Sequence, residues 1–116
     1  MRDLENLIIR LKKSGYVKAA ILFGSHAKRK AREDSDVDVC VITSRQTDQP
    51  LEFSSGKFDI SLFHKLPLTV RYRVFKHGKI LLNKDDKLLT RLKFWTVTHY
   101  LDEAHWRNRF TKKVIA

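Results

Sequence analysis

The sequence predicts a single α/β (α+β) domain, residues 1–116, built on a mixed β-sheet flanked by helices. Two short apolar runs, 17–23 and 37–42, are typical of buried strands, and residues 57–63 alternate between apolar and polar. Apolar side chains recur at helical spacing near both ends of the chain. A length of 116 residues suits one domain, and no internal repeat or linker divides it.

The first half of the chain predicts helix, strand, helix and strand in turn. A first helix is indicated by apolar residues at helical spacing, with Gly15 as its stop signal: Leu4, Leu7, Ile8 and Leu11. The apolar run 17–23 ends at Gly24-Ser25, and residues 26–32 form a short basic helix in this interpretation. The strand at 37–42 follows a turn at Asp34-Ser35.

The second half predicts strand, helix, strand and a long final helix. After a polar loop over 43–50, residues 57–63 place Phe58, Ile60 and Leu62 on one face of a strand. A helix is expected from Pro67 to His77, ended by Gly78, with a short strand at 79–82. The C-terminal helix, with Asp85 and Asp86 near its start, shows helical spacing in Leu88, Leu92, Trp95 and His99.

The composition indicates a cytoplasmic protein that favours anionic partners. The formal net charge is +11, a field that attracts nucleoside triphosphates, nucleic acid or an acidic protein, although a lysine-rich surface explains the excess equally well. No apolar stretch approaches the roughly 20 residues that span a bilayer, so no membrane association is expected. The start of the chain lacks a signal-peptide layout, and the single Cys40 suits a reducing compartment.

Two aspartates at the mouth of an apolar strand suggest a metal site. Asp36 and Asp38 point to the same face because side chains alternate along a strand, and they lie about 7 Å apart along the chain. Their oxygen ligands favour Mg²⁺ or Mn²⁺. The alternative without a function is that the two aspartates only cap the strand. Three valines alternate with them and are expected to pack into the core: Val37, Val39 and Val41.

A phosphate-binding turn and a third carboxylate fit the same hypothesis. Gly24-Ser25 lies where a strand ends and a helix begins, where a glycine turn and helix N-terminal amides bind phosphate. Asp59 points away from Phe58 and Ile60, so it joins the other two aspartates if its strand lies beside theirs. Three such carboxylates are the layout of two-metal nucleotidyl transfer. Otherwise Asp59 is a solvent-facing strand residue.

The sequence resembles the minimal nucleotidyltransferase (MNT) family of the DNA polymerase β-type nucleotidyltransferase superfamily. Residues 22–39, LFGSHAKRKAREDSDVDV, resemble that family's usual FGSRARG…SDIDL. The matching positions are Phe23, Gly24, Ser25, Ala27, Ser35, Asp36 and Asp38. The sequence departs from the pattern at His26 and Lys28, where arginines are common, and at Arg29, where glycine is common. Lys28 keeps the positive charge of the arginine.

The resemblance implies a fold, a reaction and a partner. It implies the polymerase β-type nucleotidyltransferase fold, with phosphates held by Gly24, Ser25 and Lys28. Asp36, Asp38 and Asp59 would be the catalytic and metal-binding residues, with Asp59 also helping to deprotonate the attacking hydroxyl. The implied activity is transfer of a nucleoside monophosphate, AMP from ATP, to a hydroxyl acceptor. The implied biology is the antitoxin of a HEPN/MNT toxin–antitoxin pair, which modifies its partner toxin.

Two other functions and the oligomeric state stay open at this point. The departures at His26, Lys28 and Arg29 also fit a binding module that neutralises a HEPN partner by occlusion, with weak or no catalysis. The basic surface also suits a nucleic-acid-binding protein, whose affinity would fall steeply with salt. Whether the chain forms homo-oligomers is likewise undecided.

Three further features have competing interpretations. Cys40 shares a face with Asp38 but is expected to be a packed core thiol. Residues 71–79, RYRVFKHGK, could bind RNA, yet inward-packed aromatics with charges on a solvated helix face are favoured. The tail from His99 carries Tyr100, Trp106 and Phe110 among basic residues, which suits either a protein interface or ordinary helix packing.

Overall fold

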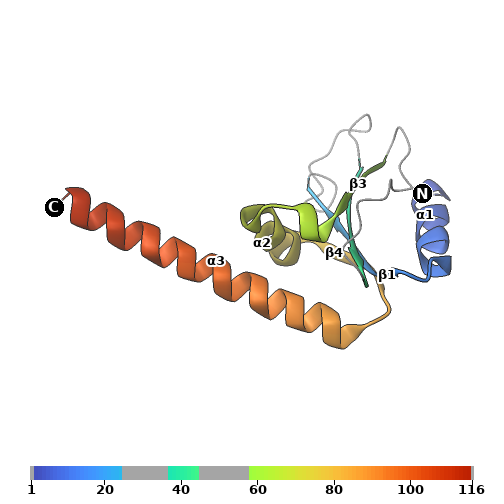
Figure 1. Ribbon diagram of the computed structural model, residues 1–116. Coiled ribbons are helices and arrows are strands. Elements are labelled where there is room, and N and C mark those ends of the chain that lie inside the picture. The colour runs from blue at the N-terminus through green and yellow to red at the C-terminus, as the bar shows by residue number, and fades with distance from the viewer. Residues whose placement is uncertain (1, 25–36, 45–57, 116) are drawn as a thin grey trace.

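The computed structural model describes residues 2–24, 37–44 and 58–115, with the side chains of 4–24, 37–44 and 58–104. These residues form helices and strands in the order that the sequence predicts (Figure 1). The helices are α1 (Arg2–Lys13), the short 3₁₀ helix η1 (Phe63–Lys65), α2 (Leu68–His77) and α3 (Asp86–Ile115). The strands are β1 (Val17–Phe23), β2 (Val37–Thr43), β3 (Phe58–Leu62) and β4 (Lys79–Asn83). The expected helix at 26–32 and most of the expected loop at 43–50 lie outside the described residues.

The four strands form one mixed sheet in the order β3-β2-β1-β4. β1 runs antiparallel to both of its neighbours, β2 and β4, whereas β2 and β3 are parallel. The prediction of a mixed sheet is therefore confirmed. The parallel pair matters most for function because it brings the beginnings of β2 and β3 to the same edge of the sheet.

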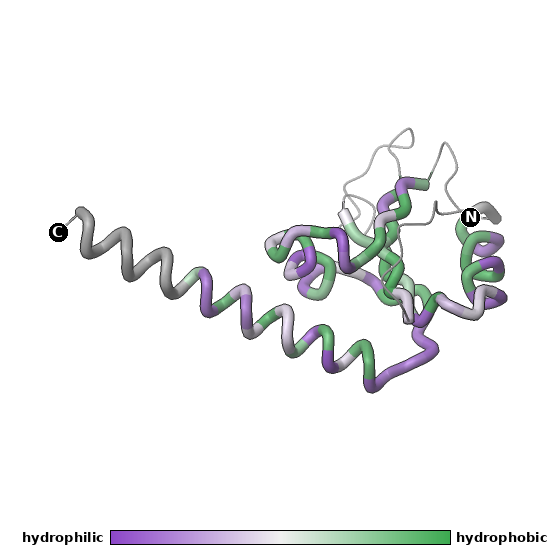
Figure 2. The backbone as a smooth tube through the Cα atoms, viewed as in Figure 1, coloured by the Kyte–Doolittle hydropathy of each residue, from purple (hydrophilic) through white to green (hydrophobic). Residues whose placement is uncertain are grey.

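Helices cover both faces of this sheet, α1 on one side and α2 with α3 on the other (Figure 1). Alternation along each strand divides the core into two layers, and the apolar strands stand out in Figure 2. The layer beneath α1 contains Leu7, Leu11, Val17, Ala20, Leu22, Val37, Val39, Val41, Phe58, Ile60 and Leu82. The opposite layer contains Ala19, Ile21, Cys40, Ile42, Phe63, Val74 and Leu89. Val37, Val39 and Val41 pack inward, as predicted.

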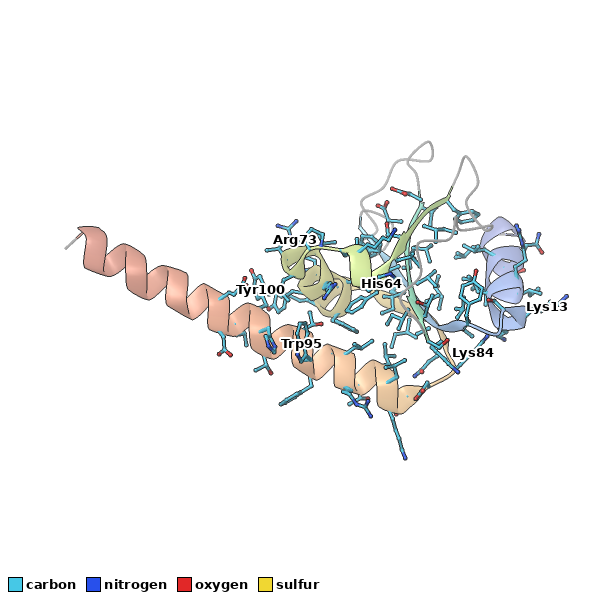
Figure 3. All side chains as sticks on the ribbon, viewed as in Figure 1. Lys13, His64, Arg73, Lys84, Trp95 and Tyr100 are labelled. Carbon is cyan, nitrogen blue, oxygen red and sulfur yellow. The ribbon has the colours of Figure 1, made fainter. Side chains whose placement is uncertain are left out.

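A lysine that follows β4 makes hydrogen bonds to the C-terminal end of α1. The Nζ of Lys84 donates hydrogen bonds to the carbonyl oxygens of Leu11, at 3.1 Å, and Ser14, at 2.7 Å (Figure 3). The carbonyls at the end of a helix have no partners within it, and the helix dipole places negative charge there. Lys84 therefore caps the C-terminal end of α1 from a position that directly follows β4.

α2 lies very close to the sheet at its C-terminal end. The N–H of Gly78 donates to the carbonyl of Val74 at 2.8 Å, which ends the helix. A Cβ at this position would clash with that carbonyl and approach Cγ2 of Ile21 to 2.5 Å. Glycine is required here because of this close approach, and Gly78 is the single residue between α2 and β4.

α3 begins on the domain and then extends beyond it (Figure 1). Asp85 is its N-cap, since its carboxylate accepts the N–H of Leu88 at 3.1 Å. Leu89 and Thr96 face inward, and Tyr100 stacks on Tyr72 of α2 with ring centroids 3.9 Å apart. No helix in the described part of the chain is long and apolar enough to cross a membrane.

Candidate functional site

Two carboxylates meet at one edge of the sheet. Asp38 is the second residue of β2 and Asp59 the second residue of β3, and the two are Cα partners in the parallel pair. Adjacent strands lie about 4.8 Å apart, so the two side chains are neighbours. Phe58 and Ile60 point into the layer beneath α1, which directs Asp59 to the opposite face, the face of Asp38 and Cys40.

Gly24 completes this edge because its backbone lies against Asp38. Phe23, the last residue of β1, pairs with Asp38, and the chain then turns at Gly24 with φ of 76°. A Cβ built on Gly24 would lie 2.5 Å from Oδ2 of Asp38 and 3.3 Å from its Cγ. Both the left-handed backbone and this lack of space demand glycine. The turn and the carboxylate therefore fit together as one unit.

This arrangement suits a hard cation beside an anionic ligand. Asp59 is exposed and Asp38 is half-buried, so a ligand can approach the edge from solvent. Carboxylate oxygens are ligands that Mg²⁺ and Mn²⁺ prefer, and the donor set of Asp38 and Asp59 fits such an ion. Among the described residues no group of three or more His, Cys, Asp or Glu gathers around one point. Asp38 and Asp59 by themselves would supply only part of the ligand set of such an ion.

The structure describes half of the residues that the sequence nominated. It brings Gly24, Asp38 and Asp59 together, which satisfies the condition that the strand of Asp59 lies beside that of Asp38. Ser25, Lys28 and Asp36 lie outside the described residues, as do His26 and Arg29. Their roles, and the catalytic roles of the other three, stay predictions.

Cys40 lies on the same face as Asp38, two residues deeper in β2. Its side chain is fully buried among the residues beneath α2 and α3. Burial raises the pKa of this thiol from its ordinary value of 9.0 to about 12, although the positive charge of Arg71 lowers it somewhat. A protonated, enclosed thiol is a poor nucleophile. Cys40 is the core residue that the sequence predicted.

Arg71 does not behave as the sequence indicated. Its neighbours in the segment 71–79 follow the prediction, since Phe75 packs edge-on against Phe63 and Arg73, Lys76 and Lys79 are exposed. The Nε of Arg71, however, donates to the carbonyl of Phe63 at 3.0 Å, and its Nη2 donates to that of His64 at 2.6 Å. Arg71 is thus held against η1 instead of lying on a solvated face. Nothing in the local sequence signals this contact, because it depends on how α2 packs beside η1.

A family model covers most of the chain. The model described as Polymerase beta, Nucleotidyltransferase matches residues 5–87, from α1 to the first turn of α3. The matched region therefore contains Gly24, Asp38 and Asp59. A protein of Methanocaldococcus jannaschii, named as a candidate protein adenylyltransferase, is 28% identical over 93 residues. That alignment covers 78% of this chain and 76% of the relative.

Solved structures share the fold over nearly the whole chain. A chain in a crystal structure of a toxin–antitoxin with AMP-PNP has a TM-score of 0.76 and 20% identity, covering 97% of this chain and 98% of that one. A second chain comes from a complex of the tri-AMPylated Shewanella oneidensis HEPN toxin with an MNT antitoxin. It has a TM-score of 0.70 and 19% identity, covering 99% of this chain and 98% of that one. At these identities the likeness establishes the fold, including the long helix α3.

Proposed function

The chain belongs to the polymerase beta nucleotidyltransferase family, and from this premise we propose that it transfers AMP from ATP to a hydroxyl group of a HEPN-domain partner protein. In this proposal the chain is the antitoxin of a toxin–antitoxin pair and uses Mg²⁺ or Mn²⁺. The observation that carries the proposal is the edge formed by Gly24, Asp38 and Asp59. The same edge joins a turn suited to phosphate with two carboxylates suited to a cation.

The relatives support the nucleotide, the reaction and the partner. One solved structure of the same fold is described with AMP-PNP, an ATP analogue, and another contains an AMPylated HEPN toxin with an MNT antitoxin. The Methanocaldococcus jannaschii relative is named for protein adenylylation. These descriptions belong to those proteins, and we extend them to this chain because it combines their fold with the carboxylate edge.

In the proposed reaction each residue has a limited task. Asp38 and Asp59 would hold the cation together with Asp36, and the backbone of Gly24 would bind the phosphates together with Ser25 and Lys28. A bound cation would neutralise negative charge on the phosphates. The acceptor oxygen forms a bond to the α-phosphorus while the bond from that phosphorus to the bridging oxygen breaks, so that pyrophosphate leaves. Asp59 accepts the proton of the acceptor hydroxyl, a role that suits its exposed position.

The test measures AMP transfer with two site variants and one matched control. Wild-type protein is incubated with α-³²P-labelled ATP, Mg²⁺ and a purified HEPN-domain protein from the same organism. We expect labelled partner from the wild type, and at least about 100-fold less from Asp38→Asn and Asp59→Asn, because a cation ligand is lost. Glu5→Gln removes one exposed carboxylate from α1, on the opposite side of the sheet, and should label the partner as well as the wild type does.

Two outcomes would contradict the proposal. Equal labelling by wild type and Asp38→Asn would show that the edge is not catalytic. Complex formation without labelling, unchanged in both variants, would favour neutralisation by occlusion. EDTA provides a second control, since it should abolish the labelling if the chain transfers AMP with a bound cation and leave the complex intact if the chain acts by occlusion.

A further inference from the structure

A pocket of about 300 Å³ lies between η1, α2 and α3. It is lined by Phe63, His64, Arg71, Arg91, Leu92 and Trp95. Phe63 directly follows β3, four residues after Asp59, so the pocket lies about 13 Å along the strand from the carboxylate edge. The pocket is therefore separate from the candidate catalytic site.

One wall of the pocket is an arginine held in a fixed position. Two carbonyls, those of Phe63 and His64, accept hydrogen bonds from Nε and Nη2 of Arg71. The guanidinium also lies over the ring of Phe63, 5.1 Å from its centroid. Arginine carries five N–H donors in a rigid plane, so its remaining donors can reach a ligand with little further loss of side-chain freedom.

The opposite wall comes from α3 and combines charge with apolar surface. Arg91 is exposed and lies one turn before Trp95, whose indole is 45% exposed. Figure 3 shows Trp95 on α3. The ring of His99 stacks on that of Trp95, with the ring centroids 4.0 Å apart. None of the described residues that line the pocket carries a carboxylate. Two guanidinium groups over an apolar floor suit a ligand that carries an anionic group beside an apolar one.

We propose that this pocket is the docking site for an acidic segment of the partner protein. A carboxylate of that segment lies between Arg71 and Arg91, and a neighbouring apolar side chain packs on Trp95 and Leu92. The identity of the partner as a HEPN-domain protein rests on the proposed function, whereas the chemistry of the segment rests on the pocket. A partner docked in this pocket would present one of its hydroxyl groups at the carboxylate edge, which lies on the same face of the sheet.

The structure favours a protein partner over the other occupants. A second copy of this chain would bring together two molecules that each carry a formal charge of +11, which opposes association. Single-stranded nucleic acid needs aromatic faces on which successive bases stack. Tyr72 and Tyr100, the aromatic pair beside the basic residues of α2, instead stack on each other at an interplanar angle of 10°.

The docking experiment compares exposed substitutions on neighbouring positions of α3. Binding of the purified HEPN protein is measured by calorimetry without ATP. We expect Arg91→Glu and Trp95→Ala each to weaken the complex at least about tenfold, as residues central to an interface do. Two variants serve as controls. Lys87→Glu makes the same charge change one turn before Arg91, and Phe94→Ala removes an aromatic side chain that is 73% exposed and directly precedes Trp95. Neither residue lines the pocket, so both controls should stay within about threefold of the wild type.

Fluorescence gives a second measurement at the same place. In a Trp106→Phe background Trp95 is the remaining tryptophan of the chain. A partner that enters the pocket should cover this indole and shift its emission to shorter wavelength, in proportion to the calorimetric saturation. Lack of wild-type binding, or equal losses in Arg91→Glu and Lys87→Glu, would overturn the inference.

Competition with RNA and a variant of the candidate catalytic site separate the remaining outcomes. A 20-nucleotide single-stranded RNA that quenches Trp95, and competes with the HEPN protein for it, would replace the protein segment as occupant and overturn the proposal. Asp38→Asn should bind the partner with wild-type affinity. If AMP transfer fails while the α3 variants still weaken binding, the proposed function is wrong and the docking site stands. If transfer occurs and its KM for the partner is unchanged in Arg91→Glu, the docking site is wrong.

Discussion

The carboxylate of Asp38 lies so close to the backbone of Gly24 that any side chain on Gly24 would clash with it. A Cβ on Gly24 would lie only 2.5 Å from Oδ2 of Asp38. Gly24 directly follows β1, and Asp38 lies in the antiparallel neighbour β2, where it pairs with Phe23, so the hydrogen-bonded register of the two strands maintains the fit. The pairing of β1 with β2 therefore determines the position of this carboxylate.

Gly24→Ala should damage both stability and activity. The left-handed backbone, with φ of 76°, and the clash with Asp38 are expected to reduce the free energy of unfolding by about 1–3 kcal/mol. The displaced carboxylate should also lower AMP transfer to the partner at least about tenfold. Gly15→Ala is the matched control, since a Cβ at Gly15 meets nothing within 4 Å. Urea denaturation of both variants checks the first expectation, and equal stabilities would contradict it.

Thr96→Val should stabilise the protein. Thr96 is completely buried on the inner face of α3, and its Oγ1 has no hydrogen-bond partner among the described residues. Replacing this hydroxyl by a methyl group removes a buried polar atom at nearly constant volume, which should raise the free energy of unfolding by about 1 kcal/mol. Thr98→Val makes the same change at an exposed position two residues away. A thermal melt in which the two variants move the Tm equally would refute this explanation.

Cys40 should make stability fall in alkaline solution. Burial raises the pKa of its thiol to about 12 in the folded chain, above the ordinary value of 9.0. Between these values the unfolded chain releases the proton first, so the folded state loses stability as the pH rises through this range. The contribution at pH 10 is on the order of 1 kcal/mol. Cys40→Ala removes it, and the difference in unfolding free energy between wild type and variant, followed from pH 8 to pH 10, should change by that amount.

The strands and helices could be predicted because their signals are local. The apolar run 17–23 and the helical spacing of the C-terminal segment each depend on neighbouring residues, and the structure confirms both. Alternation also placed Asp38, Cys40 and Asp59 on their faces. That Asp38 and Asp59 lie side by side could be predicted only on the condition that their strands are neighbours, because a single sequence does not state which strands pair.

The pocket and the Lys84 contact could not be predicted for the same physical reason. Arg71 reaches carbonyls seven and eight residues earlier, and Arg91 approaches it from a different helix. Lys84 lies 73 residues from Leu11. Contacts of this kind depend on the packing of whole elements. A cationic residue after a strand gives no sign that it will cap a distant helix.

The bond from Lys84 to α1 has a consequence for how such proteins diversify. This bond joins the residue that follows β4 to the end of α1, two residues before α3 begins. The family match stops close to this point, at residue 87. Residues 101–103 of α3 are exposed, and no described side chain beyond Tyr100 belongs to the core layer on either face of the sheet. Substitutions there can accumulate without disturbing the register of β1 and β2 that positions Asp38. The outer part of α3 and the sheet edge that holds Asp38 can therefore evolve at different rates.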